Sequence, residues 1–152
     1  MLIIDLNRKP YNEAEDYLVD YFSRKIVLQE KNREICKIVG SPGLGKANLC
    51  NQVAKRISEK LELENPFQMK LFKCDMLSQP DDFLLPMLAC TGEVIVLRSI
   101  DIPDTGIGFF VLDNPQRTDP SMRKFLNTMI EDHKIGSIDL PEKWDIIILE
   151  DN

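Results

Sequence analysis

The residues best placed to do chemistry form a glycine-rich segment, Gly40-Ser41-Pro42-Gly43-Leu44-Gly45-Lys46. The segment has the G-x-x-x-x-G-K spacing of a phosphate-binding loop, and it lies between an apolar run and a stretch with helical periodicity. Glycines let main-chain N–H groups approach an anion closely, and the positive end of the following helix dipole adds to the attraction. Lys46 would then reach the terminal phosphates. The segment predicts a phosphate site; the alternative is a glycine-rich turn that only caps a helix.

The position after the lysine departs from this pattern. The motif requires Ser or Thr there, because the hydroxyl oxygen ligates the Mg²⁺ that accompanies the nucleotide. This chain has Ala47 followed by Asn48, so position 47 offers no side-chain oxygen. Phosphate contacts survive this change, whereas the placement of a metal comes to depend on other groups. ATP or ADP is the candidate ligand, Mg²⁺ is a candidate with weakened binding, and nucleotide binding is favoured over hydrolysis.

A second chemical signal is Asp113, which follows the apolar run Phe109–Leu112 and precedes Asn114. Ligands of open α/β sheets collect at the carboxyl ends of the strands, where this carboxylate would lie. Asp113 is therefore the candidate Mg²⁺ ligand, acting directly or through water. Taken alone, Asp-Asn-Pro would be an ordinary turn after a strand. The phosphate-loop pattern upstream favours the metal-binding role.

The elements that must position these residues alternate between helix and strand. Apolar residues recur at threes and fours between Ala14 and Phe22, which predicts a helical N-terminal segment at 1–33. A second helix is predicted from Lys46 to about Leu61. Strands are predicted at 35–39, 71–74, 94–97, 109–112 and 146–149, and several are continuous apolar runs typical of parallel strands covered on both faces. The fold class predicted is a three-layer α/β/α sandwich with a mainly parallel sheet, in one domain at 1–152 whose core is 34–152.

Composition narrows the function classes. The 152 residues are 43% apolar and 29% charged, as in a globular protein of one domain. The net charge of -6 would repel phosphate backbones, which argues against nucleic-acid binding. No run approaches the roughly 20 apolar residues of a membrane span, and the start MLIIDLNRKP does not have the pattern of a signal peptide. We expect a cytoplasmic protein that does not contact membranes.

Cysteine and aromatic residues favour structural roles. The four cysteines form no close pair of the kind found in zinc ribbons or redox motifs, so we expect buried thiols. His133 is expected at a helix end. Trp144 is expected to pack at the entrance to the last strand, and a partner-contact role on a preceding hairpin is the alternative.

Several motifs in the same order resemble the core of the AAA+ ATPases, specifically the MoxR-like branch, from about Ile35 to Asn152. The phosphate loop resembles Walker A, and Val111-Leu112-Asp113-Asn114 resembles Walker B. Further similar segments are 77–82 after the second strand, 119–121 at a helix start, 133–144 as the hairpin before the sensor-1 strand, and 145–149 as that strand. By this resemblance Asn152 takes the place of the sensor-1 asparagine. The resemblance implies a P-loop fold that binds nucleotide through residues 40–48, Asp113 and Asn152.

Departures from the family pattern bear on activity. Asn114 stands where the family has the glutamate that activates the attacking water, and an amide cannot accept the proton of that water. With Ala47, two groups that act in one transition state are replaced. Because the resemblance places Asn152 at sensor 1, we expect no fifth core strand after it, no helical lid and no sensor-2 arginine. Arg117 and Arg123 lie too early for the arginine finger.

The sequence thus predicts a pseudo-ATPase: a degenerate AAA+-like protein that acts as a binding or regulatory module. It would join an active ATPase assembly or block one, with an ATPase subunit or its adaptor as the protein partner. A compact derivative of this kind would suit a phage. One alternative is a slow Mg²⁺-dependent ATPase completed by a partner subunit, and another is a nucleotide-sensing switch. A fragment of a longer ATPase would not by itself explain Ala47 and Asn114.

Overall fold

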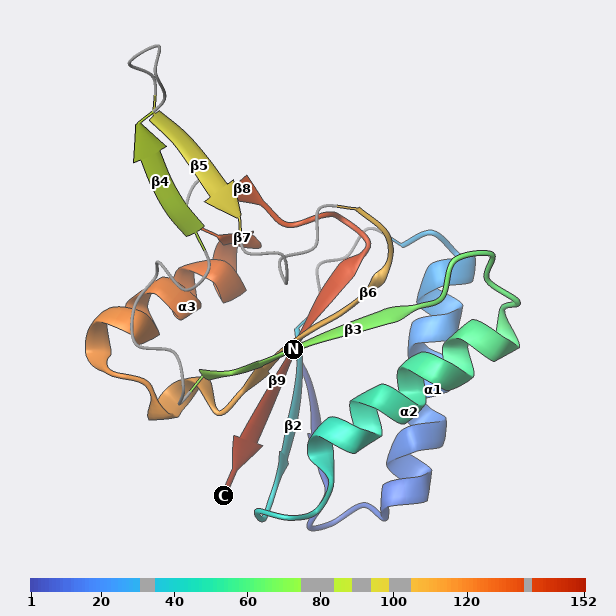
Figure 1. The fold of residues 1–152 in the computed structure, drawn as a ribbon. Coiled ribbons are helices and arrows are strands. Elements are labelled where there is room, and N and C mark those ends of the chain that lie inside the picture. The colour runs from blue at the N-terminus through green and yellow to red at the C-terminus, as the bar shows by residue number, and fades with distance from the viewer. Residues whose placement is uncertain (31–34, 75–83, 89–93, 99–104, 136–137) are drawn as a thin grey trace.

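A five-stranded parallel sheet forms the centre of the molecule (Figure 1). The computed structural model describes residues 1–30, 35–74, 105–135 and 138–152, together with the backbone of 84–88 and 94–98. The strand order is β1-β2-β9-β6-β3, and every neighbouring pair is parallel. The strands are β1 (Leu2–Asp5), β2 (Cys36–Gly40), β3 (Gln68–Lys73), β6 (Gly108–Asp113) and β9 (Trp144–Asp151). The predicted α/β fold class with a mainly parallel sheet is confirmed.

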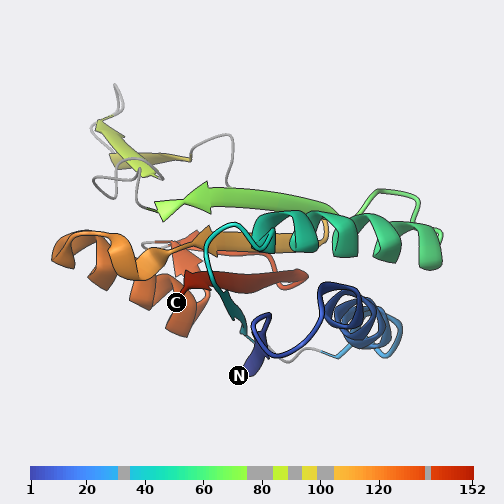
Figure 2. The same cartoon turned by 90° about the horizontal axis from the view of Figure 1, so that it is seen from below.

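Helices cover both faces of this sheet, so the molecule has three layers (Figure 2). Helices α1 (Tyr11–Val27) and α2 (Lys46–Lys60) lie on one face. Helix α3 (Pro120–Asp132) lies on the other, followed by a small hairpin of β7 (Lys134–Ile135) and β8 (Ile138–Asp139). Because both faces are covered, β6 and the middle of β9 are continuous apolar runs, as their sequences predicted.

The layer with α1 and α2 encloses the first hydrophobic core. The stripe of α2 that was expected from its four-residue spacing is buried at Leu49, Val53 and Ile57. Phe109 of β6 receives the ring of Phe22 from α1 edge-on, with the ring centroids 4.7 Å apart. These contacts fix α2 against the sheet, and with it the loop that precedes α2.

The layer with α3 encloses the second core. Phe110 and Leu112 of β6 point to this side and are fully buried, as are Met122 and Leu126 of α3. Trp144 is also buried in this core, and its indole Nε1 donates a hydrogen bond to the carbonyl oxygen of Thr105 at 2.9 Å. The expected packing role of Trp144 at the start of the last strand is therefore confirmed.

The N-terminal segment contains more than the predicted helix. Leu2–Asp5 forms β1, one of the two edge strands of the sheet. It pairs in parallel with β2, so that Ile4 lies opposite Ile38. The prediction of a helical segment at 1–33 is therefore wrong at Leu2–Asp5, and the sheet takes its fifth strand from the N-terminal residues. Four residues are too few to show a periodicity, and their strand conformation depends on a pairing with residues more than thirty positions away.

Two further strand predictions have different outcomes. The run at 94–97 does form a strand, β5 (Val94–Arg98), but β5 pairs antiparallel with β4 (Leu84–Leu88) in a separate two-stranded sheet. The hairpin expected within 133–144 is present as β7 and β8.

The similarity noted at 77–82 and the thiol of Cys90 lie outside the described residues. Cys36, Cys50 and Cys74 are buried, as expected.

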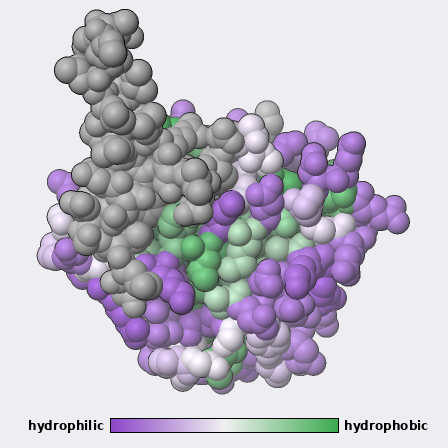
Figure 3. Space-filling model, in the orientation of Figure 1, coloured by the Kyte–Doolittle hydropathy of each residue, from purple (hydrophilic) through white to green (hydrophobic). Residues whose placement is uncertain are grey.

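On the face shown in Figure 3, a hydrophobic band runs through the middle, and much of the coloured surface around it is hydrophilic. The band follows the outer strand β3, where Leu71 is 37% exposed, and hydrophilic surface over α2 borders it. Within the described part of the chain, no helix combines the length and apolarity that a membrane span needs.

The adjacent residues Ile3 and Ile4 test whether β1 belongs to the folded sheet. Ile4 is 3% exposed, so Ile4→Ala should lower the free energy of unfolding by about 2–4 kcal/mol, the usual cost of truncating a buried Ile. Ile3 is 59% exposed, and Ile3→Ala should change it by less than about 0.5 kcal/mol. Urea denaturation of both variants measures the difference. Equal effects of the two substitutions would show that β1 is not packed as described.

Candidate phosphate-binding site

The glycine-rich segment joins the end of β2 to the start of α2, as its sequence predicted. Gly43 and Gly45 have φ angles of 85° and 80°, in the left-handed region that favours glycine. Gly45 immediately precedes the first residue of α2. The first N–H groups of a helix have no acceptor within the helix, and they carry the positive end of its dipole. The loop therefore presents main-chain donors at the carboxyl edge of the sheet.

Lys46 is held tightly beneath this loop. Its side chain is 6% exposed, and its Nζ donates hydrogen bonds to the carbonyl oxygens of Gly40 at 3.0 Å and Ser41 at 3.1 Å. The same Nζ forms an ion pair with Oδ1 of Asp151 at 2.7 Å. The ammonium group thus links both ends of the connection between β2 and α2 to the last residue of β9.

Asp151 connects several groups of the site. Parallel pairing of β2 with β9 sets Asp151 opposite Gly40, beside the loop. While Oδ1 contacts Lys46, Oδ2 accepts a hydrogen bond from Nδ2 of Asn114 and lies 3.1 Å from Nη1 of Arg117. The hydrogen bond from Lys46 is the main cause that holds the pKa of Asp151 below its ordinary value; Asn114 and Arg117 add to it, while burial opposes it. Asp151 is therefore ionised at neutral pH.

Asp113, the candidate metal ligand, lies at the end of β6 beside Leu149 of β9. Its Oδ1 accepts a hydrogen bond from Nδ2 of Asn114 at 3.3 Å. Asp113 and Lys46 line one pocket of about 270 Å³, so the structure brings the two together. The pocket is lined by Pro42, Gly43, Gly45, Lys46, Ala47, Asn48, Asp113, Asn114, Leu149 and Asp151. Across the described ranges, no cluster of three or more His, Cys, Asp or Glu side chains is placed to hold a metal ion, so this pocket offers two carboxylates.

Asn114 has its hydrogen-bonding groups engaged within the protein. Its Nδ2 donates to both Asp113 and Asp151, while its Oδ1 accepts from the main-chain N–H of Asp151 at 2.9 Å and from Gln116 at 3.1 Å. Its φ of 53° is left-handed, a conformation that Asn tolerates better than most residues. The side chain is a structural bridge between two carboxylates, and an amide in this position does not act as a base.

The other predicted site residues lie beside the pocket. Asn152 is exposed; its main-chain N–H donates to Gly40 at 3.2 Å, and its Oδ1 accepts a hydrogen bond from Asn7 at 2.9 Å. Ser41 donates through both N–H and Oγ to Oδ1 of Asn7. Gly40, Ser41, Leu44 and Asn152 are not among the pocket-lining residues. The side chain of β9 that meets Lys46 is Asp151 and not Asn152.

Four contributors to the site were not assigned from the sequence: Asn7, Tyr11, Arg117 and Asp151. Tyr11 lies at the start of α1, and its hydroxyl oxygen accepts a hydrogen bond from Asn48 at 3.1 Å; burial raises its pKa. Only Asp151 had a usable signal. Like Asp113, it is an acidic residue that closely follows an apolar strand, and the carboxyl ends of neighbouring parallel strands lie at one edge.

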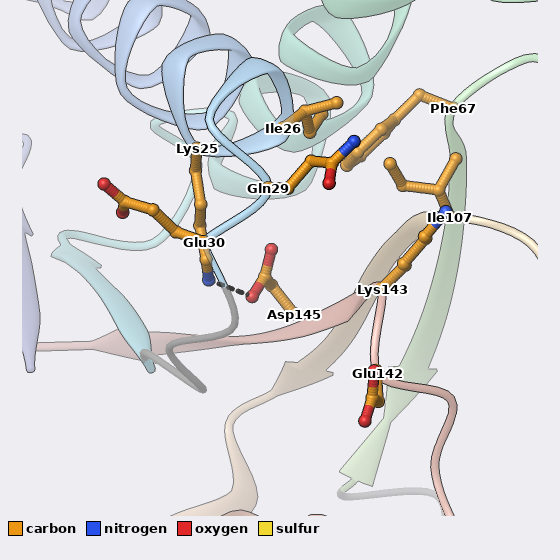
Figure 4. Close-up of a pocket in the computed structure, with 9 residues that line it drawn as sticks. All are labelled: Lys25, Ile26, Gln29, Glu30, Phe67, Ile107, Glu142, Lys143 and Asp145. Carbon is orange, nitrogen blue, oxygen red and sulfur yellow. Dashed lines mark hydrogen bonds and ion pairs between the residues drawn. The ribbon is translucent and has the colours of Figure 1, made fainter.

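A larger cavity of about 400 Å³ lies at the other edge of the sheet (Figure 4). Its walls come from the end of α1 and from residues next to the beginnings of β3, β6 and β9. Figure 4 shows Lys25 and Asp145 pointing toward each other, and their ion pair measures 2.6 Å. The smaller pocket carries the better case for function, because the glycine-rich loop, the start of α2 and two strand-end carboxylates converge there.

Comparison with known proteins identifies the fold. No protein-family model matches the sequence, and no curated protein sequence matches it. Two point mutants of RuvB from Thermotoga maritima superpose with TM-scores of 0.59 and 0.55, at 15% identity over 92% of this chain and 39% of theirs. The T. maritima RuvB Holliday junction branch migration motor gives a TM-score of 0.51 at 14% identity, over 94% of this chain and 38% of its own. The chain therefore shares its fold with RuvB, an AAA+ P-loop ATPase, and spans less than half of RuvB.

The bridging role of Asn114 predicts the effect of an isosteric change. Asn114→Asp replaces the donor of two hydrogen bonds with a third carboxylate between Asp113 and Asp151, so the free energy of unfolding at neutral pH should fall by about 1–3 kcal/mol. Asn127→Asp adds the same charge on the exposed side of α3 and should change it by less than about 0.5 kcal/mol. Urea denaturation measures both. An Asn114→Asp protein as stable as the control would contradict the bridge.

The pKa of Asp151 predicts how stability depends on pH. Because its folded-state pKa lies below the ordinary value of 3.8, its charged form contributes stability fully above that pH. The contribution is lost as the pH falls through the folded-state pKa. The difference in unfolding free energy between the wild type and Asp151→Asn should therefore be constant from about pH 7 to 5 and shift against the wild type below about pH 4. Urea midpoints across this range test it; a difference independent of pH would be incompatible with the Lys46–Asp151 ion pair.

Proposed function

We propose that this chain is a nucleotide-binding module that holds the phosphates of ATP or ADP in the pocket at Lys46 and does not hydrolyse them efficiently. The glycine-rich loop supplies main-chain donors and Lys46 supplies a cation. The fold shared with RuvB supports this reading, since the loop lies between a central strand and its following helix in a sheet of that class. Asn48, at the third position of α2, lines the same pocket.

The observation that carries the second half of the proposal is the hydrogen bonding of Asn114. A water molecule that attacks a phosphate needs a group to orient it and accept its proton. Asn114 stands at that position, and its amide is committed to Asp113, Asp151 and Gln116. Ala47 adds the loss of a metal-ligating hydroxyl. Removal of such a base commonly lowers a rate by about two to four powers of ten.

We further propose that the module acts through a protein partner. A site that binds without turnover has its effect through the surface that the bound state presents, and an ATPase subunit or its adaptor is the partner that a shared fold suggests. The RuvB structure is that of a Holliday junction branch migration motor. The net charge of -6 does not support a direct role on DNA for this chain. The β7–β8 hairpin before the last strand supports placing the chain near the MoxR-like branch.

One observation favours a second candidate, a slow Mg²⁺-dependent ATPase. Arg117 brings a guanidinium group within 3.1 Å of Asp151, so a second cation, besides Lys46, contacts this pocket-lining carboxylate. Such a cation could stabilise charge on a transferred phosphoryl group. This candidate still needs a base from a partner subunit, and phosphate release distinguishes it from the first.

Calorimetric titration with ATP and Mg²⁺, followed by a phosphate-release assay, tests the proposal. The wild type should bind with a micromolar dissociation constant and release no phosphate above background. Lys46→Ala should weaken binding by more than about tenfold because the only lysine that lines the described pocket is lost. Lys60→Ala, at the far end of the same helix and half exposed, is the matched control and should bind as the wild type does.

Two outcomes would decide against this function. An absence of ATP and ADP binding by the folded wild type would leave a protein that uses the fold only as a scaffold. Steady phosphate release that Lys46→Ala abolishes would instead establish the slow ATPase. Circular dichroism of each variant shows that the comparison is made between folded proteins.

A further inference from the structure

The carboxylate of Asp151 contacts the groups that a bound phosphate would need. Its Oδ1 forms an ion pair with the ammonium of Lys46 at 2.7 Å. Its Oδ2 forms an ion pair with the guanidinium of Arg117 and accepts a hydrogen bond from the amide of Asn114, each at 3.1 Å. A phosphate likewise offers anionic oxygens to a lysine, an arginine and neutral donors. Asp151 therefore contacts the same kinds of donor group that a phosphate would contact.

Burial strengthens the ion pair between Lys46 and Asp151. The side chains of Lys46 and Asp151 are 6% and 14% exposed, so their interaction is screened much less than an ion pair on the surface. An incoming anion must compete with a carboxylate that is covalently part of the chain and already in contact distance. The lysine of the loop is thus not simply available to any polyphosphate.

The charged side chains that line the described pocket are one lysine, Lys46, and two carboxylates, Asp113 and Asp151. Arg117 adds a positive charge through its ion pair with Asp151. A nucleotide without a metal adds several negative charges to this set, beside two carboxylates. When a nucleotide binds together with a divalent cation, the cation offsets part of the negative charge of the phosphates. Carboxylate oxygens are also ligands that Mg²⁺ prefers.

The two carboxylates are arranged so that one cation could meet both. Asp113 and Asp151 lie on either side of the Nδ2 atom of Asn114, at 3.3 and 3.1 Å, which keeps their oxygens close to each other. They come from adjacent strand ends, β6 and β9, beside the loop. Ala47 supplies no oxygen at the usual position, whereas Asp151 adds a second carboxylate to the pocket.

We propose that Asp151 is an internal counter-anion that makes nucleotide binding conditional on a divalent cation. In the ligand-free protein it neutralises Lys46. When a metal–nucleotide complex binds, a phosphate replaces the carboxylate of Asp151 as the partner of Lys46. The carboxylates of Asp151 and Asp113 would then bind the metal, directly or through water. This inference rests on the proposed nucleotide site and adds its selectivity for the metal complex over the free nucleotide.

The test is calorimetric titration with ATP in buffer that contains either MgCl₂ or EDTA. The wild type should bind ATP at least about tenfold more tightly with Mg²⁺ than with EDTA, a typical size for coupling between two ligands. Asp151→Asn removes the charge and keeps the shape, so its affinity in EDTA should rise about tenfold and the dependence on Mg²⁺ should shrink. Glu150→Gln removes one charge from the neighbouring residue of β9, which pairs with Lys37 outside the pocket, and it should behave as the wild type does.

The outcomes separate this inference from the function beneath it. If the wild type binds ATP equally well with Mg²⁺ and EDTA, nucleotide binding stands and the counter-anion role is overturned, a result that needs no variant. If Asp151→Asn retains the wild-type ratio, the role is likewise overturned. If the folded wild type binds ATP in neither buffer, the proposed function fails and this inference fails with it.

Discussion

The ion pair between Lys46 and Asp151 is the interaction on which the arrangement of the site depends. A lysine that is almost fully buried is costly unless a charge and hydrogen-bond acceptors receive it, and here Asp151 and two loop carbonyl oxygens do so. The pair joins β2, the glycine-rich loop, α2 and β9 at one point. Because Asp151 also contacts Arg117 and Asn114, the segment that follows β6 is fixed to the same point.

This geometry requires three adjacent strands to end together. β9 is the middle strand of the sheet, and its pairing with β2 and β6 sets Asp151 beside Gly40 and Leu149 beside Asp113. A shift of one residue in either register would turn the wrong side chains toward the pocket. The register is set by the packing of individual side chains in the two cores, because Ile147 and Leu149 belong to the first core and Ile146 and Ile148 to the second. The two cores thus determine the positions of the charges at the strand ends.

The sequence predicted features that depend on local spacing. The loop, the start of α2 and the strand that ends at Asp113 were all expected, because glycine spacing, a four-residue periodicity and a continuous apolar run each act over a few neighbouring residues. β1 and Asp151 were not assigned. The positions of both are set by strand pairing between distant segments. The family resemblance placed Asn152 at the sensor-1 position, and an alignment of motifs could not tell which of Asp151 and Asn152 contacts Lys46. The bridging contacts of Asn114 are likewise set by the tertiary structure.

The charged and amide side chains of this pocket are physically coupled. With Asp113 and Asp151 at neighbouring strand ends, a glutamate at position 114 would place a third carboxylate beside a single buried lysine, without the amide that now bridges the first two. Like charges held this close disfavour one another's ionised forms, so a base introduced there would be protonated or displaced. The neutral amide of Asn114 thus allows the carboxylate of Asp151 to lie near that of Asp113. The carboxylate of Asp151 in turn neutralises Lys46. A change at Asn114 or Asp151 alone would leave the other group in place, so the chemistry of this site depends on the whole set of charges.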